Sequence, residues 1–247
     1  YGDQGVLKVL ALDSFDFGKV QIALFSPGAA VSAEYAPKAA SQGCIVIDNT
    51  SHFRMDDEIP LIIPEVNVEA LAGFRNKNII ANPNCSTIQL LVALKPLHDK
   101  GKIKRAVACT YQSVSGAGKE GMDELMQQTR AILMNMPTEP KKFMKPIAFN
   151  VIPQIDSFME DGYTKEEWKM TVETRKILDP AIDLVATCVR VPVFVGHAIA
   201  AHVEFENPVS RAEATRLLRS GPGIRVIDNP EDFSYTTPTE IAGDDSV

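Results

Sequence analysis

Residues 20–48 read VQIALFSPGAAVSAEYAPKAASQGCIVID, and the expected fold follows from them. The apolar run at residues 20–25 predicts a buried strand that ends in a turn at residues 26–28. Residues 32–42 have the composition of a helix, and a second apolar run covers residues 44–48. Strand, helix and strand within so few residues predict a βαβ unit, and therefore a parallel sheet with a right-handed crossover.

A further strand-like run, residues 79–81, stops at residues 82–84 (Asn-Pro-Asn), and Cys85 follows directly. The Asn-Pro step favours a turn and disfavours helix before the proline, while Ser86 and Thr87 suit the first turn of a helix. Cys85 is therefore expected near a helix N-terminus, where free N–H groups and the positive end of the helix dipole stabilise a thiolate. This makes Cys85 a candidate nucleophile, and a buried structural cysteine is the alternative.

Ligands of parallel sheets gather at the carboxyl ends of the strands. Three predicted loops lie at that edge, namely residues 26–28, residues 48–51 and the turn before Cys85. Together they predict a ligand site. Arg54, just beyond the second loop, is either an anion-binding residue of this site or a solvated side chain.

The composition limits the class of protein. The chain has 247 residues, enough for one large domain or two smaller ones. A hydrophobic content of 45% is typical of a globular enzyme, and a net charge of -7 argues against nucleic acid or an anionic membrane as the main partner. No apolar run of about 18 residues is present, so no membrane span is predicted. The 4 cysteines lack C-x-x-C spacing, so we expect no metal site, no disulfide framework and a cytoplasmic location.

Strands and helices no longer alternate strictly beyond residue 84. Two capping-box patterns, at residues 164–167 and 210–213, predict that helices start there. This mixture predicts an α+β second domain that begins near residue 84. The predicted strands of this part are residues 103–110, 185–191 and 198–205, and a further helix is expected at residues 119–133.

Two basic residues near the end of the chain are candidates for substrate contacts. Alternation along residues 198–205 places His197 on the apolar side of the strand and His202 on the acidic, solvated side. A histidine on a buried face is either part of a functional site or a core residue whose ring nitrogens are hydrogen-bonded. Both interpretations stay open for His197. Arg190 is expected to point away from the apolar side, where it either clamps a carboxylate with two hydrogen bonds or stays an exposed strand arginine.

Further polar candidates lie between these segments. Glu173 and Lys176 are three residues apart on a predicted helix, so they form either a surface ion pair worth about 0.2–0.5 kcal/mol or part of a site. Gln112 follows the strand expected to end at residue 110. The Gly-x-Gly turn that begins at Gly116, directly after Ser115, permits close approach of a ligand to the backbone, although such a turn is common without a ligand.

Taken together, these segments resemble the aspartate-semialdehyde dehydrogenase family. The matching blocks occur in the family's order and cover the chain from about residue 15 to its C-terminus, which makes the resemblance specific. The blocks are Asp48-Asn49-Thr50-Ser51 with Phe53-Arg54-Met55, Pro64-Glu65-Val66-Asn67, Asn82-Pro83-Asn84-Cys85-Ser86-Thr87, Thr110-Tyr111-Gln112 with Ser115-Gly116-Ala117-Gly118-Lys119-Glu120, Lys169-Met170 with Glu173-Thr174, and Thr187-Cys188-Val189-Arg190-Val191-Pro192-Val193 with His197.

The resemblance implies a reaction and an architecture. The reaction is the reversible, NADP-dependent reductive dephosphorylation of L-aspartyl-4-phosphate to L-aspartate 4-semialdehyde, a step in the biosynthesis of lysine, threonine, methionine and isoleucine. The implied fold class is α/β, with a truncated Rossmann-type parallel sheet in residues 1–84 as a partial NADP-binding domain. An α+β catalytic and dimerisation domain follows in residues 85–247. A homodimer or a dimer of dimers is expected.

The resemblance also implies roles for single residues. By position, Cys85 corresponds to the nucleophile that forms a thioester, His197 to the acid/base, and Gln112 to the residue that orients the acyl group. Arg190 corresponds to the clamp on the substrate's α-carboxylate, and Glu173 to the partner of its ammonium group. The phosphate-binding positions are Arg54, Asn84 and Lys176, and the cofactor-binding positions are Ser26, Ser115 and Gly116.

The chain departs from the family's pattern at both ends. No Gly-rich phosphate-binding turn precedes residue 20, and the family's final helix does not follow Val247. We therefore expect an internal portion of a longer enzyme, which by itself binds NADP poorly. Three other functions stay open, namely an N-acetylglutamyl-phosphate reductase, a non-catalytic oligomerising fragment, and a Cys-His acyl hydrolase that needs no nicotinamide.

Overall fold

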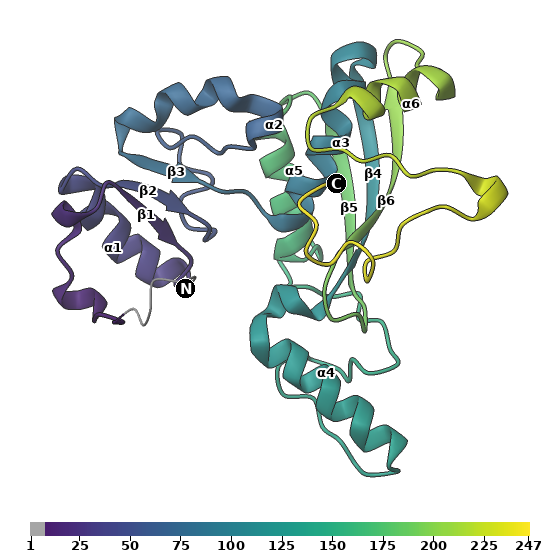
Figure 1. The fold of residues 1–247 in the computed structure, drawn as a ribbon, viewed down its shortest axis with the longest axis horizontal. Coiled ribbons are helices and arrows are strands. Elements are labelled where there is room, and N and C mark those ends of the chain that lie inside the picture. Colours follow the sequence, from purple (N-terminus) through teal and green to yellow (C-terminus); the bar gives the residue numbers. More distant parts are fainter. Residues whose placement is uncertain (1–7) are drawn as a thin grey trace. The chain divides into compact units, whose positions relative to one another are not determined.

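The computed structural model describes residues 8–247, so the first seven residues of the predicted N-terminal domain lie outside the described part. The chain divides into two compact units, which are described separately (Figure 1). The first unit comprises Tyr1–Ile62 and Glu69–Asn82, and the second comprises Ile63–Val68 and Pro83–Val247. The assignment of cofactor binding to residues 1–84 and of catalysis to residues 85–247 stays a prediction.

The first unit is built around a small parallel sheet. Its elements are η2 (Leu12–Ser14), η3 (Phe17–Lys19), β1 (Ile22–Phe25), α1 (Ala29–Ser41), β2 (Ile45–Asp48), η4 (Val68–Asn76) and β3 (Ile79–Ala81). The strand order is β1-β2-β3, with Ile22 opposite Ile45 and Val46 opposite Ile79. α1 connects the first two strands, as Figure 1 shows. The predicted βαβ unit and its parallel sheet are confirmed.

Two details of the first unit differ from the expectations. α1 begins at Ala29 rather than at residue 32, because Gly28 has a φ of 99° and ends the preceding turn there. β1 is not a fully buried strand, since Ile22 is 58% exposed and Leu24 is 79% exposed. Within residues 8–247, the opposite face of the strand, which carries the buried Phe25, is the covered one. The prediction of a buried strand is therefore wrong for one of its faces.

The second unit contains a mixed sheet with helices on one face. Its elements are α2 (Pro64–Asn67), α3 (Cys85–Gly101), β4 (Ile103–Gln112), η5 (Val114–Ala117), α4 (Gly118–Leu133), α5 (Lys165–Ile177), β5 (Asp183–Arg190), β6 (Ala198–Phe205), α6 (Arg211–Ser220) and η6 (Pro230–Asp232). The strand order is β5-β4-β6, with β5 parallel and β6 antiparallel to β4. α3 and α5 pack against the sheet, and α6 packs against α3 (Figure 1). The predicted α+β arrangement is confirmed.

The core of the second unit lies between this sheet and its helices. Every second residue of β5 is buried, from Leu184 through Ala186 and Cys188 to Arg190. Cys188 Sγ lies 3.6 Å from Sδ of Met170 on α5. Burial raises the pKa of Cys188 to about 12, so this thiol stays protonated and serves as an apolar core group.

The two predicted capping boxes differ in the structure. At α5 the box is complete, because the Thr164 hydroxyl accepts from the N–H of Glu167 and the Glu167 carboxylate accepts from the N–H of Thr164 at 2.7 Å. At α6, the N–H of Glu213 donates to Ser210 Oγ at 3.3 Å, while the Glu213 carboxylate lies 3.3 Å from Lys100 Nζ. The second box is therefore only half formed, since a lysine of α3 pairs with the carboxylate.

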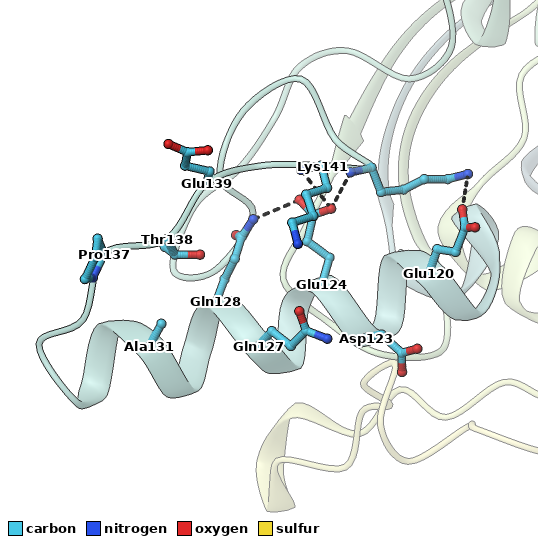
Figure 2. Close-up of a pocket in the computed structure, with 11 residues that line it drawn as sticks. Glu120, Asp123, Glu124, Gln127, Gln128, Ala131, Pro137, Thr138, Glu139 and Lys141 are labelled. Atoms are coloured by element: carbon cyan, nitrogen blue, oxygen red, sulfur yellow. Dashed lines mark hydrogen bonds and ion pairs between the residues drawn. The ribbon is translucent and has the colours of Figure 1, made fainter.

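α4 and the segment after it form an arm, and a partly open pocket of about 690 Å³ lies between them (Figure 2). The buried Glu124 accepts hydrogen bonds from Gln128 Nε2 at 2.8 Å, from the N–H of Lys141 at 3.1 Å and from the N–H of Lys142. Gln128 Oε1 accepts from the N–H of Ile147 at 2.8 Å. These bonds hold the returning segment on the helix. None of the predicted site residues lines this pocket.

His98 is a buried titratable residue near the end of α3. Its Nδ1 accepts a hydrogen bond from the N–H of Ile103 at 3.2 Å, and its Nε2 lies 3.3 Å from Asp179 Oδ2. Burial lowers the pKa of His98, and the charge of Lys102 lowers it further. The unfolded chain therefore binds a proton at this position more readily than the folded chain does. The free energy of unfolding should consequently fall as the pH drops below about 6.5.

The substitution His98→Gln tests this linkage. The glutamine carbonyl can still accept from the N–H of Ile103, but the side chain takes up no proton. We expect the free energy of unfolding to fall less between pH 7 and pH 5 in this variant than in the wild type. Urea denaturation at the two pH values measures the difference. Equal falls in both proteins would mean that another group causes the pH dependence.

Candidate active site

Cys85 is the first residue of α3, as the Asn-Pro-Asn turn predicts. Asn84 is the N-cap of this helix, and its Oδ1 accepts hydrogen bonds from the N–H groups of Ser86 at 2.9 Å and Thr87 at 3.3 Å. The cap therefore satisfies two of the N–H groups of the first turn. Part of Cys85 remains exposed.

The surroundings of Cys85 favour the neutral thiol. Desolvation of the sulfur raises the pKa of Cys85, and the negative charge of Glu166 raises it further. The N–H and hydroxyl of Ser86 and the positive charge of Arg190 act in the opposite direction but do not outweigh these two effects. The helix start thus lowers the pKa of this thiol as predicted, but burial and Glu166 raise it by more.

Glu166, in the first turn of α5, is hydrogen-bonded both to Asn84, which precedes Cys85, and to Gln112 on β4. Its buried Oε1 accepts from Asn84 Nδ2 at 2.8 Å and from Gln112 Nε2 at 3.1 Å. The same carboxylate acts on the pKa of Cys85. Glu166 was not among the predicted site residues because it stands inside a capping-box pattern, which accounts for a glutamate there without a site.

Lys169 is a second residue of this network that was not predicted as part of a site. Its Nζ lies 2.8 Å from Asp156 Oδ2 and 3.3 Å from Glu166 Oε2. Burial lowers the pKa of Lys169, but the hydrogen bond with Asp156 and the charge of Glu166 outweigh burial and raise it. The signal in the sequence was the three-residue spacing of Glu166 and Lys169, the same spacing that singled out Glu173 and Lys176.

Glu173 and Lys176 lie further along α5. Glu173 is 1% exposed and accepts a hydrogen bond from the N–H of Asn84 at 2.7 Å. Glu173 is therefore not a surface residue, whereas the alternative placed it in an ion pair on the surface. Lys176 is partly exposed. α5 thus presents two carboxylates, those of Glu166 and Glu173, to the residue that caps α3.

Gln112 and Arg190 lie opposite each other at the carboxyl ends of β4 and β5. Gln112 is 1% exposed, and its Oε1 accepts from Thr110 Oγ1 at 2.9 Å. Arg190 is buried, and its Nη1 donates to the carbonyl of Ser113 at 2.7 Å. Arg190 therefore does not point away from the apolar side, because the buried face of β5 continues to the end of the strand. Both that expectation and the alternative of an exposed arginine are wrong.

His197 directly precedes β6 and is half-buried. Its Nδ1 accepts from the N–H of Ser113 at 3.0 Å and lies 3.0 Å from Ser113 Oγ, which in turn lies 2.9 Å from Ser115 Oγ. Burial lowers the pKa of His197, and the positive charge of Arg190 lowers it further, so the ring is neutral near pH 7. His202 is exposed, as the strand alternation predicts.

Gly116 brings the backbone of η5 close to both basic side chains. A Cβ at this position would lie 3.1 Å from Arg190 Nη1 and 3.5 Å from His197 Nε2. A side chain here would therefore press on the guanidinium, and only glycine leaves this space open.

In the first unit, the loops that follow the three strands meet at one edge, as predicted. Asn49 Nδ2 donates to Ser26 Oγ at 3.3 Å, and Asn82 Nδ2 donates to Asn49 Oδ1 at 2.7 Å. Arg54 is buried and donates to the carbonyls of Thr50 at 3.1 Å and Asn49 at 3.0 Å, so it is not a freely solvated side chain. Among the predicted site residues, only Ser26 and Arg54 belong to this unit.

Two family models match the chain. The model described as "Semialdehyde dehydrogenase, NAD binding domain" matches residues 2–74, and the model described as "Semialdehyde dehydrogenase, dimerisation domain" matches residues 94–247. An aspartate-semialdehyde dehydrogenase of Shewanella sp. (strain DB6705) is 54% identical over 242 residues, which are 98% of this chain and 71% of the relative. The chain belongs to the aspartate-semialdehyde dehydrogenase family.

Other members of the aspartate-semialdehyde dehydrogenase family agree. Aspartate-semialdehyde dehydrogenase 2 of Vibrio cholerae is 57% identical over 221 residues, which are 89% of this chain and 66% of the relative. The crystal structure of aspartate semialdehyde dehydrogenase II complexed with ASA from Vibrio cholerae has a TM-score of 0.91 and 55% identity, and the match covers 94% of this chain and 68% of that chain. The resemblance found in the sequence is confirmed, and so is the α/β fold class.

Proposed function

We propose that this chain catalyses the reversible reductive dephosphorylation of L-aspartyl-4-phosphate to L-aspartate 4-semialdehyde. The observation that carries the proposal is the polar network beside Cys85. In this network the buried carboxylates of Glu166 and Glu173 accept hydrogen bonds from Asn84. The buried Arg190 lies at the carboxyl end of β5. Carboxylates together with a guanidinium suit the ammonium and carboxylate groups of a free amino acid. The Vibrio cholerae relative described as complexed with ASA is consistent with such a ligand.

In the direction of reduction, the thiolate form of Cys85 attacks the acyl carbon of the acyl phosphate, so that a thioester bond forms and the bond to phosphate breaks. Gln112 orients the acyl group. A nicotinamide cofactor, when bound, supplies the hydride that reduces the thioester. Hydride addition leaves a thiohemiacetal oxyanion, whose collapse breaks the C–S bond and releases the aldehyde and the Cys85 thiolate. In the oxidative direction the Cys85 thiolate adds to the aldehyde, and His197 removes the hydroxyl proton of the protonated thiohemiacetal as the hydride leaves.

We assign the substrate's α-carboxylate to Arg190 and its ammonium group to the carboxylates on α5. Glu173 is the residue that the family pattern selects, and Glu166 is a second candidate because its charge acts on Cys85. An ammonium group beside Glu166 would offset the charge that raises the pKa of Cys85. Substrate binding would then itself favour the reactive thiolate.

By their match to the family pattern, phosphate-binding roles are assigned to Arg54 in the first unit and to Asn84 and Lys176 in the second. Lys169 adds a further cation on the same helix as Lys176, and two neighbouring carboxylates hold it in place. Substitution of each cation in turn, followed by measurement of KM for phosphate in the oxidative direction, ranks their contributions.

We propose NADP as the cofactor and Ser26, Ser115 and Gly116 as residues that hold it. The turn after β1 suits a phosphate-bearing ligand for two reasons. The space beside Gly28 is open, because a Cβ there would meet no atom within 4 Å. The 13-residue helix α1 begins at the next residue, and the N–H groups at a helix start bind phosphate. Gly116 likewise leaves the space beside His197 free of a side chain. The choice of NADP over NAD rests on the family resemblance, and initial rates with the two cofactors test it.

The function is tested by following NADP reduction with L-aspartate 4-semialdehyde in the presence and absence of phosphate. We expect reduction that depends on both the aldehyde and phosphate. Reduction with the N-acetylglutamate aldehyde alone would instead indicate an N-acetylglutamyl-phosphate reductase. Release of aspartate from aspartyl phosphate without NADPH would indicate an acyl hydrolase. No turnover in any assay would indicate a non-catalytic oligomerising protein.

We further propose a homodimer, or a dimer of dimers, formed through the sheet face that α3 and α5 leave uncovered. On this face Val107 is 37% exposed and Tyr111 is 44% exposed. Apolar side chains that gather on one exposed face mark an interaction surface. The family's dimerisation model covers this sheet. No helix within residues 8–247 is long and apolar enough to cross a membrane. The cytoplasmic location and the absence of a metal or nucleic-acid partner stay predictions.

Arg190→Lys is expected to raise KM for L-aspartate 4-semialdehyde about 10- to 100-fold while kcat changes less. A lysine keeps one positive charge and can still donate to the carbonyl of Ser113. It cannot donate two parallel hydrogen bonds to one carboxylate, so substrate binding weakens. Steady-state kinetics measure both constants, and an unchanged KM would contradict the role assigned to Arg190.

A further inference from the structure

Ser113 connects the two basic side chains of the candidate site. Its carbonyl accepts from Arg190 Nη1 at 2.7 Å, and its N–H donates to His197 Nδ1 at 3.0 Å. Its side chain is fully buried, and Oγ lies 3.0 Å from the same Nδ1 and 2.9 Å from Ser115 Oγ. Ser115 is partly exposed. Two hydroxyl groups therefore lead from the back of the imidazole ring toward the surface.

The two groups of Ser113 that reach Nδ1 of His197 favour different tautomers. The N–H can only donate, so it stabilises the tautomer that carries its proton on Nε2. The hydroxyl can also accept, so it can bind a proton on Nδ1 and leave Nε2 free to take up another proton. Ser113 thus provides a partner for both neutral forms of the ring.

A charged imidazolium is unfavourable at this position. The guanidinium of Arg190 is hydrogen-bonded to the same residue that binds the ring, and a second positive charge beside it would be repelled. Burial and Arg190 also lower the pKa of His197. A proton that arrives on Nε2 is therefore best accommodated when the proton on Nδ1 leaves at the same time.

We propose that Ser113 is a positioning residue that relays protons behind His197, and this rests on the proposed function, in which His197 takes up the thiohemiacetal proton. Nε2 accepts that proton, the Nδ1 proton passes to Ser113 Oγ, and the former Ser113 hydroxyl proton passes to Ser115 Oγ. Ser115 releases its own hydroxyl proton to water. Each hydroxyl ends with one proton, and the ring stays neutral with its proton on Nε2. In that form Nδ1 accepts from the N–H of Ser113, as in the structure.

The substitution Ser113→Ala tests the relay, because it removes Oγ and keeps both backbone contacts without adding volume. We expect kcat to fall about 100-fold, the lower end of what general acid–base catalysis contributes, while KM stays within about twofold. Ser113→Thr keeps the hydroxyl and is expected to restore most of kcat. Ser115→Ala interrupts only the second link and is expected to have a smaller effect.

Nitrogen-15 NMR of histidine-labelled protein gives a measurement that does not depend on turnover. The chain has only 4 histidines, so the ring signals of His197 can be identified by their loss in His197→Asn. We expect both neutral tautomers of His197 in exchange in the wild type. In Ser113→Ala we expect the tautomer with the proton on Nε2 to predominate, because the N–H of Ser113 still donates to Nδ1 while the hydroxyl that can accept from Nδ1 is gone.

The outcomes separate the relay from the proposed function. If His197→Asn is inactive but Ser113→Ala matches the wild type in kcat and tautomers, the relay is wrong and the proposed function stands. If Ser113→Ala is slow with unchanged tautomers, the loss is structural and the relay is again wrong. If the wild type does not turn over L-aspartate 4-semialdehyde, the proposed function fails, whereas the tautomer shift still decides whether Ser113 controls the ring.

Discussion

Cys85→Ala should lower kcat by about 10⁴-fold or more, because the proposed reaction passes through a bond to this sulfur and no neighbouring group can replace it. Of the other cysteines, Cys44 and Cys188 are buried, and burial raises the pKa of both thiols. Alanine suits the first position of α3 and leaves the cap at Asn84 intact. The free energy of unfolding should therefore change by less than about 0.5 kcal/mol, which separates lost chemistry from lost structure.

Two further variants sharpen this result. Cys85→Ser keeps a weaker nucleophile in the same place and is expected to retain a trace of activity. Cys109→Ser is the matched control, since Cys109 lies on β4 and has no role in the proposed reaction. It should keep wild-type kinetics. Iodoacetamide should inactivate the wild type and Cys109→Ser at the same rate. Wild-type turnover in Cys85→Ala would refute the thioester mechanism.

Glu166→Gln should change activity and thiol reactivity in opposite directions. The glutamine carbonyl can still accept from Asn84 and Gln112, but the negative charge beside Cys85 and Lys169 is lost. We expect kcat/KM to fall about 100-fold, which corresponds to about 2.8 kcal/mol, because the ammonium group of the substrate loses a charged partner. The pKa of Cys85 should fall, because the charge of Glu166 is one of the causes that raise it.

The two effects are measured separately. Steady-state kinetics report kcat/KM, and the pH dependence of alkylation at Cys85 reports its pKa. Glu167→Gln is the matched control. The Glu167 carboxylate caps α5 and is not bonded to Asn84, and a glutamine can also form a capping box. An alkylation profile of Glu166→Gln that stays at the pH of the wild type would contradict the assigned role of this charge.

The parts of the fold that were predicted correctly depend on short stretches of sequence. The βαβ unit follows from two apolar runs around one helix, and the complete capping box at Thr164 follows from four consecutive residues. The position of Cys85 at the start of α3 follows from the preceding Asn-Pro-Asn turn. Each of these features is decided by neighbours along the chain, so residue patterns were sufficient.

The parts that were missed depend on contacts between distant segments. The hydrogen bond between Asn84 and Glu166 joins residues 82 positions apart, and no local pattern reports it. The buried orientation of Arg190 depends on how far the core extends along β5, and the half-formed capping box of α6 depends on Lys100 of another helix. The net effect on the pKa of Cys85 was missed for the same reason, since a carboxylate from α5 opposes the helix start.

Asn84 has a consequence for how this enzyme can vary. Its Oδ1 caps α3, its Nδ2 binds Glu166 and its N–H binds Glu173, so one residue fixes the start of one helix against two positions of another. Replacements at these three positions should therefore show strong energetic coupling, with double-mutant effects that differ from the sum of the single ones. We therefore expect that Asn84, Glu166 and Glu173 either change together in evolution or all stay the same.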